Sequence, residues 1–518
     1  MKKARVELPV TRRRFLSGGL ALAALAAPWR SLASVNRYRA ETSPFTLGVA
    51  SGDPSPDGVV LWTRLAPDPL HDGGMPPEPV AVHWEIALDE AMRRPIRTGA
   101  ATAVPEWAHS VHVEVNGLEP DRWYWYRFRA GDAESAIGRT RTLPSIGSRV
   151  DRLRFAFASC QNYEQGLYTA YRHLAAEEVQ VVFHLGDYIY EGPPRFDRPR
   201  LHAGPEPKTL QGYRNRYAQY KSDPDLQLAH AACPWIVTWD DHDVADNYAG
   251  AISQNDDPVE QFLLRRAAAY QAYYEHLPLR RFSLPHGPDA RMYRDFTCGD
   301  LASFFVLDTR QYRTDQPCGD NTTWPCSGML DPHATMLGAA QERWLFEGLH
   351  RSRAKWHVLP QQVMVARVNR SQNNRERYSM DQWPGYEVER MRLLKFLGER
   401  RPANPVVLTG DLHSNWVNDL STDDRRERET IVATEFVGTS ISSGGDGSDF
   451  PDGVTPVLVD NPFVKFYNEQ RGYVTCEITP EAMHANFRVL DYVSRPGGSC
   501  STRATFVVEN GRAGAERE

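Results

Sequence analysis

Four short apolar segments of the sequence each run directly into side chains that can bind a cation. The side chains are Cys160, Asp187 with Tyr190, Asp241 with His242, and Asp411 with His413. Thiolate, carboxylate, phenolate and imidazole groups together suit hard and borderline metal ions. This combination therefore predicts a metal site and not a metal-free nucleophilic triad.

Each of these residues taken singly has a commoner structural use. An aspartate at the end of a strand is more often a cap or turn residue, and a buried cysteine is often a small apolar side chain or half of a disulfide. Four clusters in one chain favour a metal site over these uses. A two-metal site also needs a carboxylate that bridges both ions, and Asp187, after a buried strand, is well placed for it.

The elements that must position these residues are those of an α/β sheet. Between residues 150 and 510, apolar runs alternate with helical stretches, which predicts strands with helices packed on the sheet faces. The runs before the four clusters are Phe155–Ala158, Val179–Leu185, Trp235–Thr238 and Val406–Leu408. Because ligand sites of open α/β sheets lie beyond the carboxyl ends of the strands, we expect the clusters to converge in space.

Residues 40–145 show a different pattern, in which short alternating runs are separated by turns. Val59–Leu65, Val80–Ile86 and Val111–Val115 each predict a half-buried antiparallel strand. The turn before Trp123–Tyr126 leads into an aromatic strand, as at the tyrosine corner of β-sandwiches. We therefore expect a small all-β domain of the immunoglobulin or fibronectin type III kind.

Residues 1–33 have the pattern of a twin-arginine (Tat) signal peptide. Arg12-Arg13-Arg14 precedes the apolar stretch Gly18–Ala27, and small residues before a cut after Ala33 complete the pattern. The apolar stretch is too short for a membrane anchor. The expected partner is the Tat export machinery, and the expected location is periplasmic or extracellular. Such proteins often fold and load metal before export.

Composition limits the remaining classes of function. The chain has 518 residues, 41% hydrophobic and 24% charged, which is typical of a globular protein of more than one domain. The net charge is −6, and without residues 1–33 it is −12, from 53 basic and 65 acidic residues. This balance argues against a nucleic-acid-binding role. No apolar run in the mature chain reaches the roughly 20 residues of a membrane-spanning helix.

Seven cysteines leave at least one unpaired. An exported protein can form disulfides, and Cys318 with Cys326, in a Gly/Pro/Asn-rich loop, is the first pair that we expect. The second disulfide that we expect joins Cys476 and Cys500.

Seven motifs are spread over nearly all of the mature chain: Ser51–Pro54, Phe157–Gln161, Gly186–Glu191, Trp239–Asp243, Asp308–Tyr312, Gly410–His413 and Glu435–Ser440. They resemble motifs of calcineurin-like metallophosphoesterases of the purple acid phosphatase type and, more closely, those of the alkaline phosphatase D (PhoD) family. The resemblance implies a two-sheet β-sandwich flanked by helices, an α/β (α+β) fold, behind the small all-β domain.

The same resemblance implies a secreted phosphomonoesterase and phosphodiesterase that uses one ferric ion (Fe3+) and one or two calcium ions (Ca2+). Cys160, Asp187, Tyr190 and His413 would hold the iron, and Asp187, Asp241 and Asp411 would serve the calcium side. Asp246 stands where the family commonly has asparagine, and an acid there can still bind calcium.

The expected mechanism is attack on phosphate by a metal-activated hydroxide. His242 is expected to contact the phosphoryl group or to protonate the leaving alkoxide. Arg310 is expected either to neutralise a phosphate oxygen or to form a surface salt bridge. Two other functions remain open, a phospholipase D-like phosphodiesterase acting on phospholipid headgroups and a non-catalytic exported metal-containing binding protein. The binding protein ranks lower, because the clusters follow strands, where reactive sites tend to lie.

Overall fold

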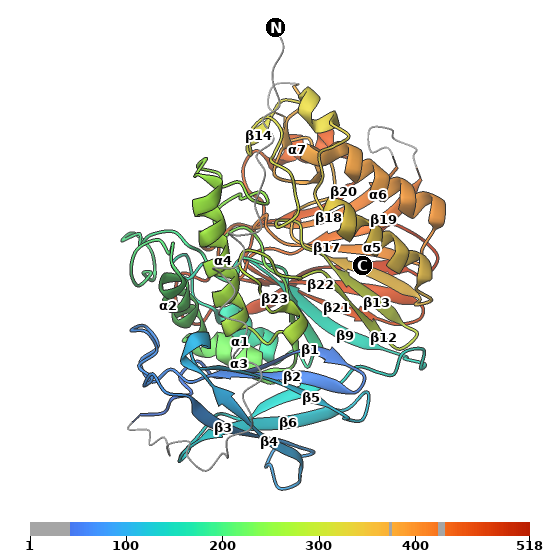
Figure 1. Ribbon diagram of the computed structural model, residues 1–518. Coiled ribbons are helices and arrows are strands. Elements are labelled where there is room, and N and C mark those ends of the chain that lie inside the picture. The colour runs from blue at the N-terminus through green and yellow to red at the C-terminus, as the bar shows by residue number, and fades with distance from the viewer. Residues whose placement is uncertain (1–41, 372–374, 423–429) are drawn as a thin grey trace, which may run out of the picture. The chain divides into compact units, whose positions relative to one another are not determined.

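The computed structural model describes residues 42–371, 375–422 and 430–518; the expected signal peptide lies outside them. The protein is a mixed α/β structure with several sheets (Figure 1). Its largest sheet has ten strands, in the order β24 (Glu516–Arg517), β23 (Cys500–Glu509), β22 (Ala482–Leu490), β21 (Gly472–Ile478), β9 (Leu153–Ala158), β10 (Val181–His184), β11 (Trp235–Val237), β1 (Val49–Ser55), β2 (Gly58–Arg64) and β5 (Ser110–Asn116).

A seven-stranded sheet faces the ten-stranded one. Its order is β12 (Arg294–Cys298), β13 (Ala302–Val306), β15 (Trp356–Pro360), β17 (Pro405–Thr409), β19 (Ile431–Val437), β18 (Asn415–Ser421) and β20 (Val464–Asn468). Apolar side chains of both sheets meet between them, and the rings of Phe155 and Phe304 lie 5.4 Å apart. A core of this kind fixes the two sheets against each other.

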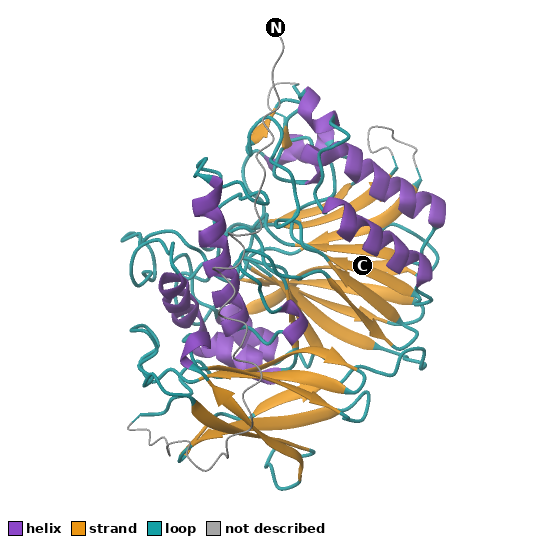
Figure 2. Cartoon of the chain, viewed as in Figure 1, coloured by secondary structure: helices purple, strands orange, loops and turns teal. Residues whose placement is uncertain are grey.

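Helices cover the outer face of each large sheet (Figure 2). The ten-stranded sheet carries α1 (Thr169–Ala175), α2 (Leu210–Lys221), α3 (Pro224–Ala232) and α4 (Val259–His276), and the seven-stranded sheet carries α5 (Gly338–Arg351) and α6 (Glu387–Arg400). The short α7 (Val454–Asp460) follows β19 in the chain. Helix α4 begins at Val259 with Pro258 in the N-cap position, and the carboxylate of the preceding Asp257 accepts a hydrogen bond from Ser253.

The expected all-β region forms a sandwich, but it is not self-contained. A five-stranded sheet of β3 (Val80–Ala87), β4 (Pro95–Ala103), β6 (Trp123–Ala130), β7 (Ala133–Glu134) and β8 (Gly138–Arg141) packs against β1, β2 and β5. Those three strands belong to the ten-stranded sheet, which β1 joins by pairing in parallel with β11. Contacts group all the described residues into one compact unit.

The parallel strands place their carboxyl ends at one edge of the two sheets. Strands β9, β10 and β11 run parallel in one sheet, and β13, β15, β17 and β19 run parallel in the other. A two-stranded sheet of β14 (Thr322–Thr323) and β16 (Tyr378–Ser379) is formed by segments that follow β13 and β15. The carboxyl-end loops are therefore where the ligand clusters must be sought.

One of the two expected disulfides forms. Cys318 and Cys326 are bonded, whereas the pairing of Cys476 with Cys500 is wrong, since both are free. Cys476 lies on β21 and Cys500 on β23, and β22 runs between these strands. Two strand spacings are about 9.5 Å, beyond the reach of a disulfide.

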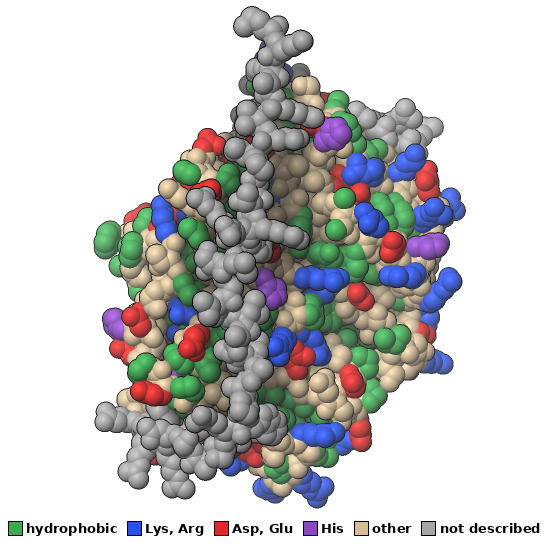
Figure 3. Space-filling model, in the orientation of Figure 1, with side chains coloured by type: hydrophobic (Ala, Val, Ile, Leu, Met, Phe, Trp, Pro, Cys, Tyr) green, Lys and Arg blue, Asp and Glu red, His purple; other side chains and the backbone are tan. Residues whose placement is uncertain are grey.

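The charged side chains on one face and the helices of the described residues can be compared with the composition. On the face shown in Figure 3, acidic and basic side chains are interspersed, and the coloured part of it has no continuous basic band. Among the described residues, no helix has the length and apolar character needed to cross a membrane.

Candidate metal centre

Three groups of potential metal ligands meet beyond the ends of the parallel strands. They are Cys160 with Asp187 and His413, Asp187 with Asp241 and His242, and Asp240 with Asp241 and Asp411. In each group the ligand atoms lie within 4.8 Å of one another. Asp187 belongs to the first two groups and Asp241 to the last two, so the three groups form one continuous cluster.

Tyr190 completes the first group. Its hydroxyl donates a hydrogen bond of 2.7 Å to Asp187 Oδ2 and lies 2.9 Å from His413 Nε2. The side chains of Cys160, Asp187 and Tyr190 are buried, and His413 is partly exposed. One thiol, one carboxyl, one phenol and one imidazole thus lie close together, and such donors can bind borderline metal ions.

The backbone at the cluster is held in an unusual conformation. Cys160, Asp187, Asp411 and His413 all have positive φ angles, of 59°, 55°, 64° and 53°. Residues other than glycine rarely adopt this region, and it recurs at functional sites where surrounding structure over-determines it. Gly186, with φ 112°, permits the approach, because a Cβ there would lie 2.4 Å from the Cβ of Asp240.

Two buried carboxylate oxygens indicate that the cluster suits cations. Asp240 Oδ2 and Asp241 Oδ1 accept no hydrogen bond from any described residue, although both are shielded from solvent. Buried polar atoms are normally satisfied, and an unsatisfied carboxylate oxygen is costly. The only cation close to Asp241 Oδ1 is Arg310, whose Nη2 lies 3.5 Å away, and Asp240 Oδ2 has no partner among the described residues. A bound cation would satisfy both oxygens, so the residues present fit metal ions.

The pKa values follow from burial and crowding of acids. Burial raises the pKa of Cys160 and of Asp187, and neighbouring carboxylates raise both further. Burial likewise raises the pKa of Asp411 to about 6. Asp241 is the exception, because Arg310 and His242 outweigh its burial and hold the pKa of that carboxyl below its usual range. A cation near these groups would favour their charged forms.

The structure excludes one of the two environments expected for Arg310. The residue is fully buried, so it forms no surface salt bridge. Its Nε donates to Asp240 Oδ1, and Nη1 and Nη2 donate to Asp381 over 2.7 and 2.9 Å. Asp241 and Asp411 lie 3.5 Å from Nη2. The guanidinium is therefore paired with carboxylates on all three of its nitrogens.

His242 lies at the partly open side of the cluster. Its Nδ1 makes a hydrogen bond of 2.8 Å with Glu191 Oε2, and its ring lies 4.2 Å from that of Tyr190. Burial alone would lower the pKa of His242, but Glu191, Asp241 and Asp187 outweigh it and raise the pKa well above its usual value. Glu191 thus fixes the orientation of the imidazole.

Asp246 is not drawn into the cluster. Its carboxylate is about half exposed, lies 3.9 Å from His242 Nε2, and is absent from the ligand groups of the described residues. Its backbone N–H donates to Glu191. The adjacent Asn247 contacts the cluster through its backbone, donating to Asp241 Oδ2 over 2.7 Å.

Four residues of the site were not among the candidates. Asp240 adds a ligand group, Glu191 orients His242, Asp381 pairs with Arg310, and Gln382 donates a hydrogen bond of 2.6 Å to Asp411 Oδ2. Asp240 and Glu191 lie inside motifs already singled out. Asp381 and Gln382 follow the two-residue strand β16, which no sequence pattern marks.

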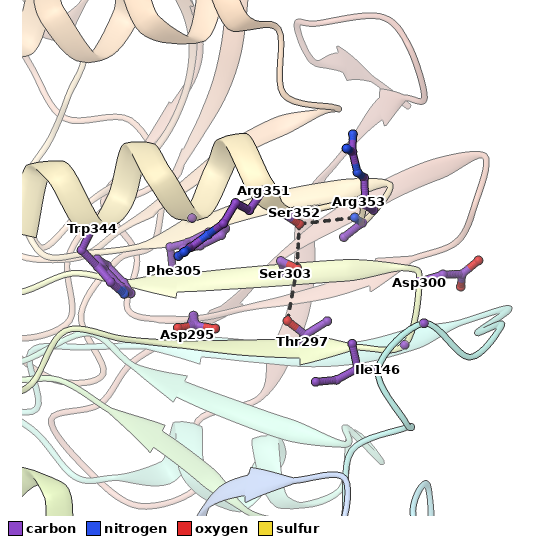
Figure 4. Close-up of a pocket in the computed structure, with 14 residues that line it drawn as sticks. Ile146, Asp295, Thr297, Asp300, Ser303, Phe305, Trp344, Arg351, Ser352 and Arg353 are labelled. Atoms are coloured by element: carbon purple, nitrogen blue, oxygen red, sulfur yellow. Dashed lines mark hydrogen bonds between the residues drawn. The ribbon is translucent and has the colours of Figure 1, made fainter.

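A pocket of about 360 Å³ lies at the other end of the seven-stranded sheet (Figure 4). Trp344, Phe305 and Asp295 line one part, and Ser352 donates a hydrogen bond of 3.0 Å to Ser303 in the other. Its lining includes Ser303, at the start of β13, whereas the metal cluster lies beyond the end of that strand. The pocket is therefore separate from the candidate metal centre.

Comparison with known proteins identifies relatives over almost the whole chain. Alkaline phosphatase D of Bacillus subtilis (strain 168) is 50% identical over 517 residues, which cover 98% of this chain and 89% of that protein. A solved structure titled "Structure of PhoD" superposes with a TM-score of 0.91 at 51% identity and covers 93% of each chain.

Two family profiles match as well. The PhoD-like phosphatase profile matches residues 155–487, and the profile of the PhoD-like phosphatase N-terminal domain matches residues 31–144. The resemblance drawn from the sequence motifs is thereby confirmed: the chain belongs to the PhoD-like phosphatase family.

Proposed function

We propose that this phosphoester hydrolase cleaves phosphate monoesters and diesters at adjacent cation positions that share Asp187. The observation that carries the proposal is the convergence of three ligand groups through Asp187 and Asp241. The fold that places them is, we propose, the metallophosphoesterase type, a two-sheet sandwich flanked by helices. Family membership favours this function over that of a non-catalytic binding protein.

The donors differ between the two sides of the cluster. Cys160, Tyr190 and His413 beside Asp187 suit ferric iron, since thiolate and phenolate favour it. Asp240, Asp241 and Asp411 offer only oxygen, which suits calcium. When bound, the cations would polarise the phosphoryl group and lower the pKa of an attacking water.

His242 is proposed to protonate the leaving oxygen. Its Nδ1 is occupied by Glu191, which leaves Nε2 on the partly exposed side of the cluster. A hydrogen bond to one imidazole nitrogen fixes the tautomer and the direction of the other. Arg310 would act indirectly, by holding Asp240 and Asp381 in place between the sheets.

Export and domain division also remain proposals. Residues 1–33 would direct Tat export and be removed, leaving the protein periplasmic or extracellular. Residues 40–145 would form the N-terminal β-region and residues 150–510 the catalytic region.

The test is elemental analysis of natively exported, dialysed protein, with Cys160→Ser as the variant. Wild type should hold about one iron and one or two calcium ions per chain, and Cys160→Ser should lose iron and any visible charge-transfer band. Cys500→Ser is the control, because Cys500 is a half-buried residue on β23 and not a ligand candidate. Unchanged iron in Cys160→Ser would remove Cys160 from the site, and a metal-free active enzyme would overturn the proposal.

A further inference from the structure

Arg370 differs from the other arginines near the metal cluster. Arg310 is committed to carboxylates, as described above. Arg313 is buried and donates to Asp381 and to the carbonyl of Thr309. These two guanidinium groups are thereby held inside the protein.

A third arginine is held in the same way. Arg471 is buried, with Nη1 donating to Ser440 Oγ over 2.7 Å and Nη2 donating to the carbonyl of Glu469.

The guanidinium of Arg370 has no such partner. It makes no hydrogen bond and no ion pair with any residue in the described ranges, and its side chain is only partly exposed. The guanidinium carbon of Arg370 lies over the aromatic ring of Trp416, 6.0 Å from the ring centroid. Burial lowers the pKa of Arg370, while the charges of Tyr467 and Asp411 oppose that shift. A partly exposed guanidinium without a protein partner keeps its donors available, so a ligand anion could pair with it.

The backbone holds Arg370 on the side of the cluster formed by Asp411. Arg370 follows β15, the neighbour of β17, and Asp411 follows β17. The connecting loop is fastened at several points. Gly410 donates to the carbonyl of Gln362 over 2.9 Å, and the N–H of Asn369 donates to Asn461 Oδ1 over 2.8 Å.

This side of the cluster is where a substrate can enter. Asp411, Leu412 and His413 are partly exposed, whereas Cys160, Asp187 and Asp241 are buried. Arginine presents a planar fork of donors that matches the oxygens of a phosphate group. Arg370 therefore combines free donors, a fixed loop and proximity to the open edge.

We propose that Arg370 binds the phosphoryl group of the substrate and favours dianionic phosphate monoesters over monoanionic diesters. The inference rests on the proposed hydrolase function. A monoester presents one more anionic oxygen than a diester at the same position, and that oxygen is the partner assigned to Arg370. Arg370 then supplies a phosphate contact, whereas Arg310 is paired with carboxylates.

The test compares Arg370→Ala and Arg370→Gln with wild type on p-nitrophenyl phosphate and bis-p-nitrophenyl phosphate. We expect kcat/KM for the monoester to fall about 10- to 100-fold, as for a lost charge-assisted hydrogen bond, and kcat/KM for the diester to fall less than about 3-fold. The inhibition constant of inorganic phosphate should rise about 10-fold, and Arg370→Lys should recover part of each loss. Metal content and thermal unfolding should stay at the wild-type values.

Arg375→Ala is the matched control. Arg375 is an exposed arginine five residues further on, and it lies over Trp324. It should leave both substrates unaffected. Equal losses on monoester and diester, an unchanged phosphate inhibition constant, or loss of metal from Arg370→Gln would each overturn the proposal. Failure of wild type to hydrolyse either substrate would instead contradict the proposed function.

Discussion

The two large sheets deliver different chemistry to the same edge. The ten-stranded sheet contributes mainly acids, with Cys160 after β9, Asp187 after β10 and Asp241 after β11. The seven-stranded sheet contributes two arginines, Arg310 after β13 and Arg370 in the loop that follows β15, besides Asp411 and His413 after β17. Opposite charges that would destabilise either sheet alone balance once the sheets pack together. The site is thus a product of the interface between the sheets.

The largest expected effect comes from removing the shared carboxylate of the ten-stranded sheet. Asp187→Asn keeps the shape of the side chain but removes the charge that bridges the ligand groups. We expect kcat/KM to fall at least about 10³-fold, with loss of bound metal. Asp449→Asn, an exposed acid paired with Arg503, should behave as wild type. Full metal content with less than about 10-fold loss would show that Asp187 is not the bridging ligand.

Breaking the charge balance from the seven-stranded side should affect stability. Arg310→Met leaves Asp240 buried without its cation, whereas Asp381 keeps its ion pair with Arg313, and we expect the free energy of unfolding to fall by about 3–5 kcal/mol in urea titrations. Adding Asp240→Asn should restore part of this loss, because it removes the unpaired charge.

Arg149→Met is the control, because it measures how much stability is lost when an exposed ion pair is removed. Arg149 lies 2.9 Å from Asp151 and both are exposed, so its loss should cost less than about 1 kcal/mol. A similar cost for Arg310→Met would mean that the two sheets do not depend on its charge.

Replacing His242 separates proton transfer from metal binding. His242→Gln should lower kcat about 100-fold for an alkyl phosphate, whose leaving alkoxide needs a proton. The effect should be small for p-nitrophenyl phosphate, whose leaving group is a weak base. Rates that fall equally for both substrates would assign His242 to metal binding, which its place beside Asp187 and Asp241 also allows.

The smallest effect concerns the core of the ten-stranded sheet behind the site. His184 on β10 is buried against Trp235, and neither ring nitrogen has a hydrogen-bond partner among the residues that the structure covers. Burial lowers the pKa of His184 to about 3 from 6.5. Below pH 6.5 His184 binds a proton in the unfolded chain but stays neutral in the folded protein. The free energy of unfolding that is present above pH 6.5 is therefore lost as the pH falls towards 3.

His184→Phe should remove this acid sensitivity. At pH 5 the histidine costs about 2 kcal/mol relative to pH 7.5, at about 1.4 kcal/mol for each pH unit below the unfolded pKa. The measurement is urea unfolding of both proteins at the two pH values. An equal loss of stability in wild type and variant would show that other groups set the acid sensitivity of this sheet.

Residues directly after apolar runs were predictable, because a strand of a parallel sheet fixes where the next residue must lie. Cys160, Asp187, Asp241 and Asp411 were found in this way, and they meet as expected. Asp381 was not, since it reaches Arg310 through a long loop that leaves no periodic pattern.

Long-range pairing escaped prediction for the same reason. Strands β1 and β11 are paired in parallel through a single residue pair, Gly52 and Trp235. Nothing in the sequence of either strand indicates that it pairs with the other. The N-terminal strands therefore predicted a separate domain, where the structure shows a shared sheet. The wrong disulfide has a similar cause, because only the order of β21, β22 and β23 shows that its cysteines are too far apart.

The shared sheet also constrains how the chain is made. Its central strands β9, β10 and β11 pair with β1 from the start of the described chain and with β21 from the end. During synthesis the edge of β9 must stay open until the last fifty or so residues emerge, and open edges invite aggregation. Release of a truncated chain would leave that edge exposed permanently. Only a chain that includes β21 closes the sheet at β9, so the central strands depend on a late segment of the sequence.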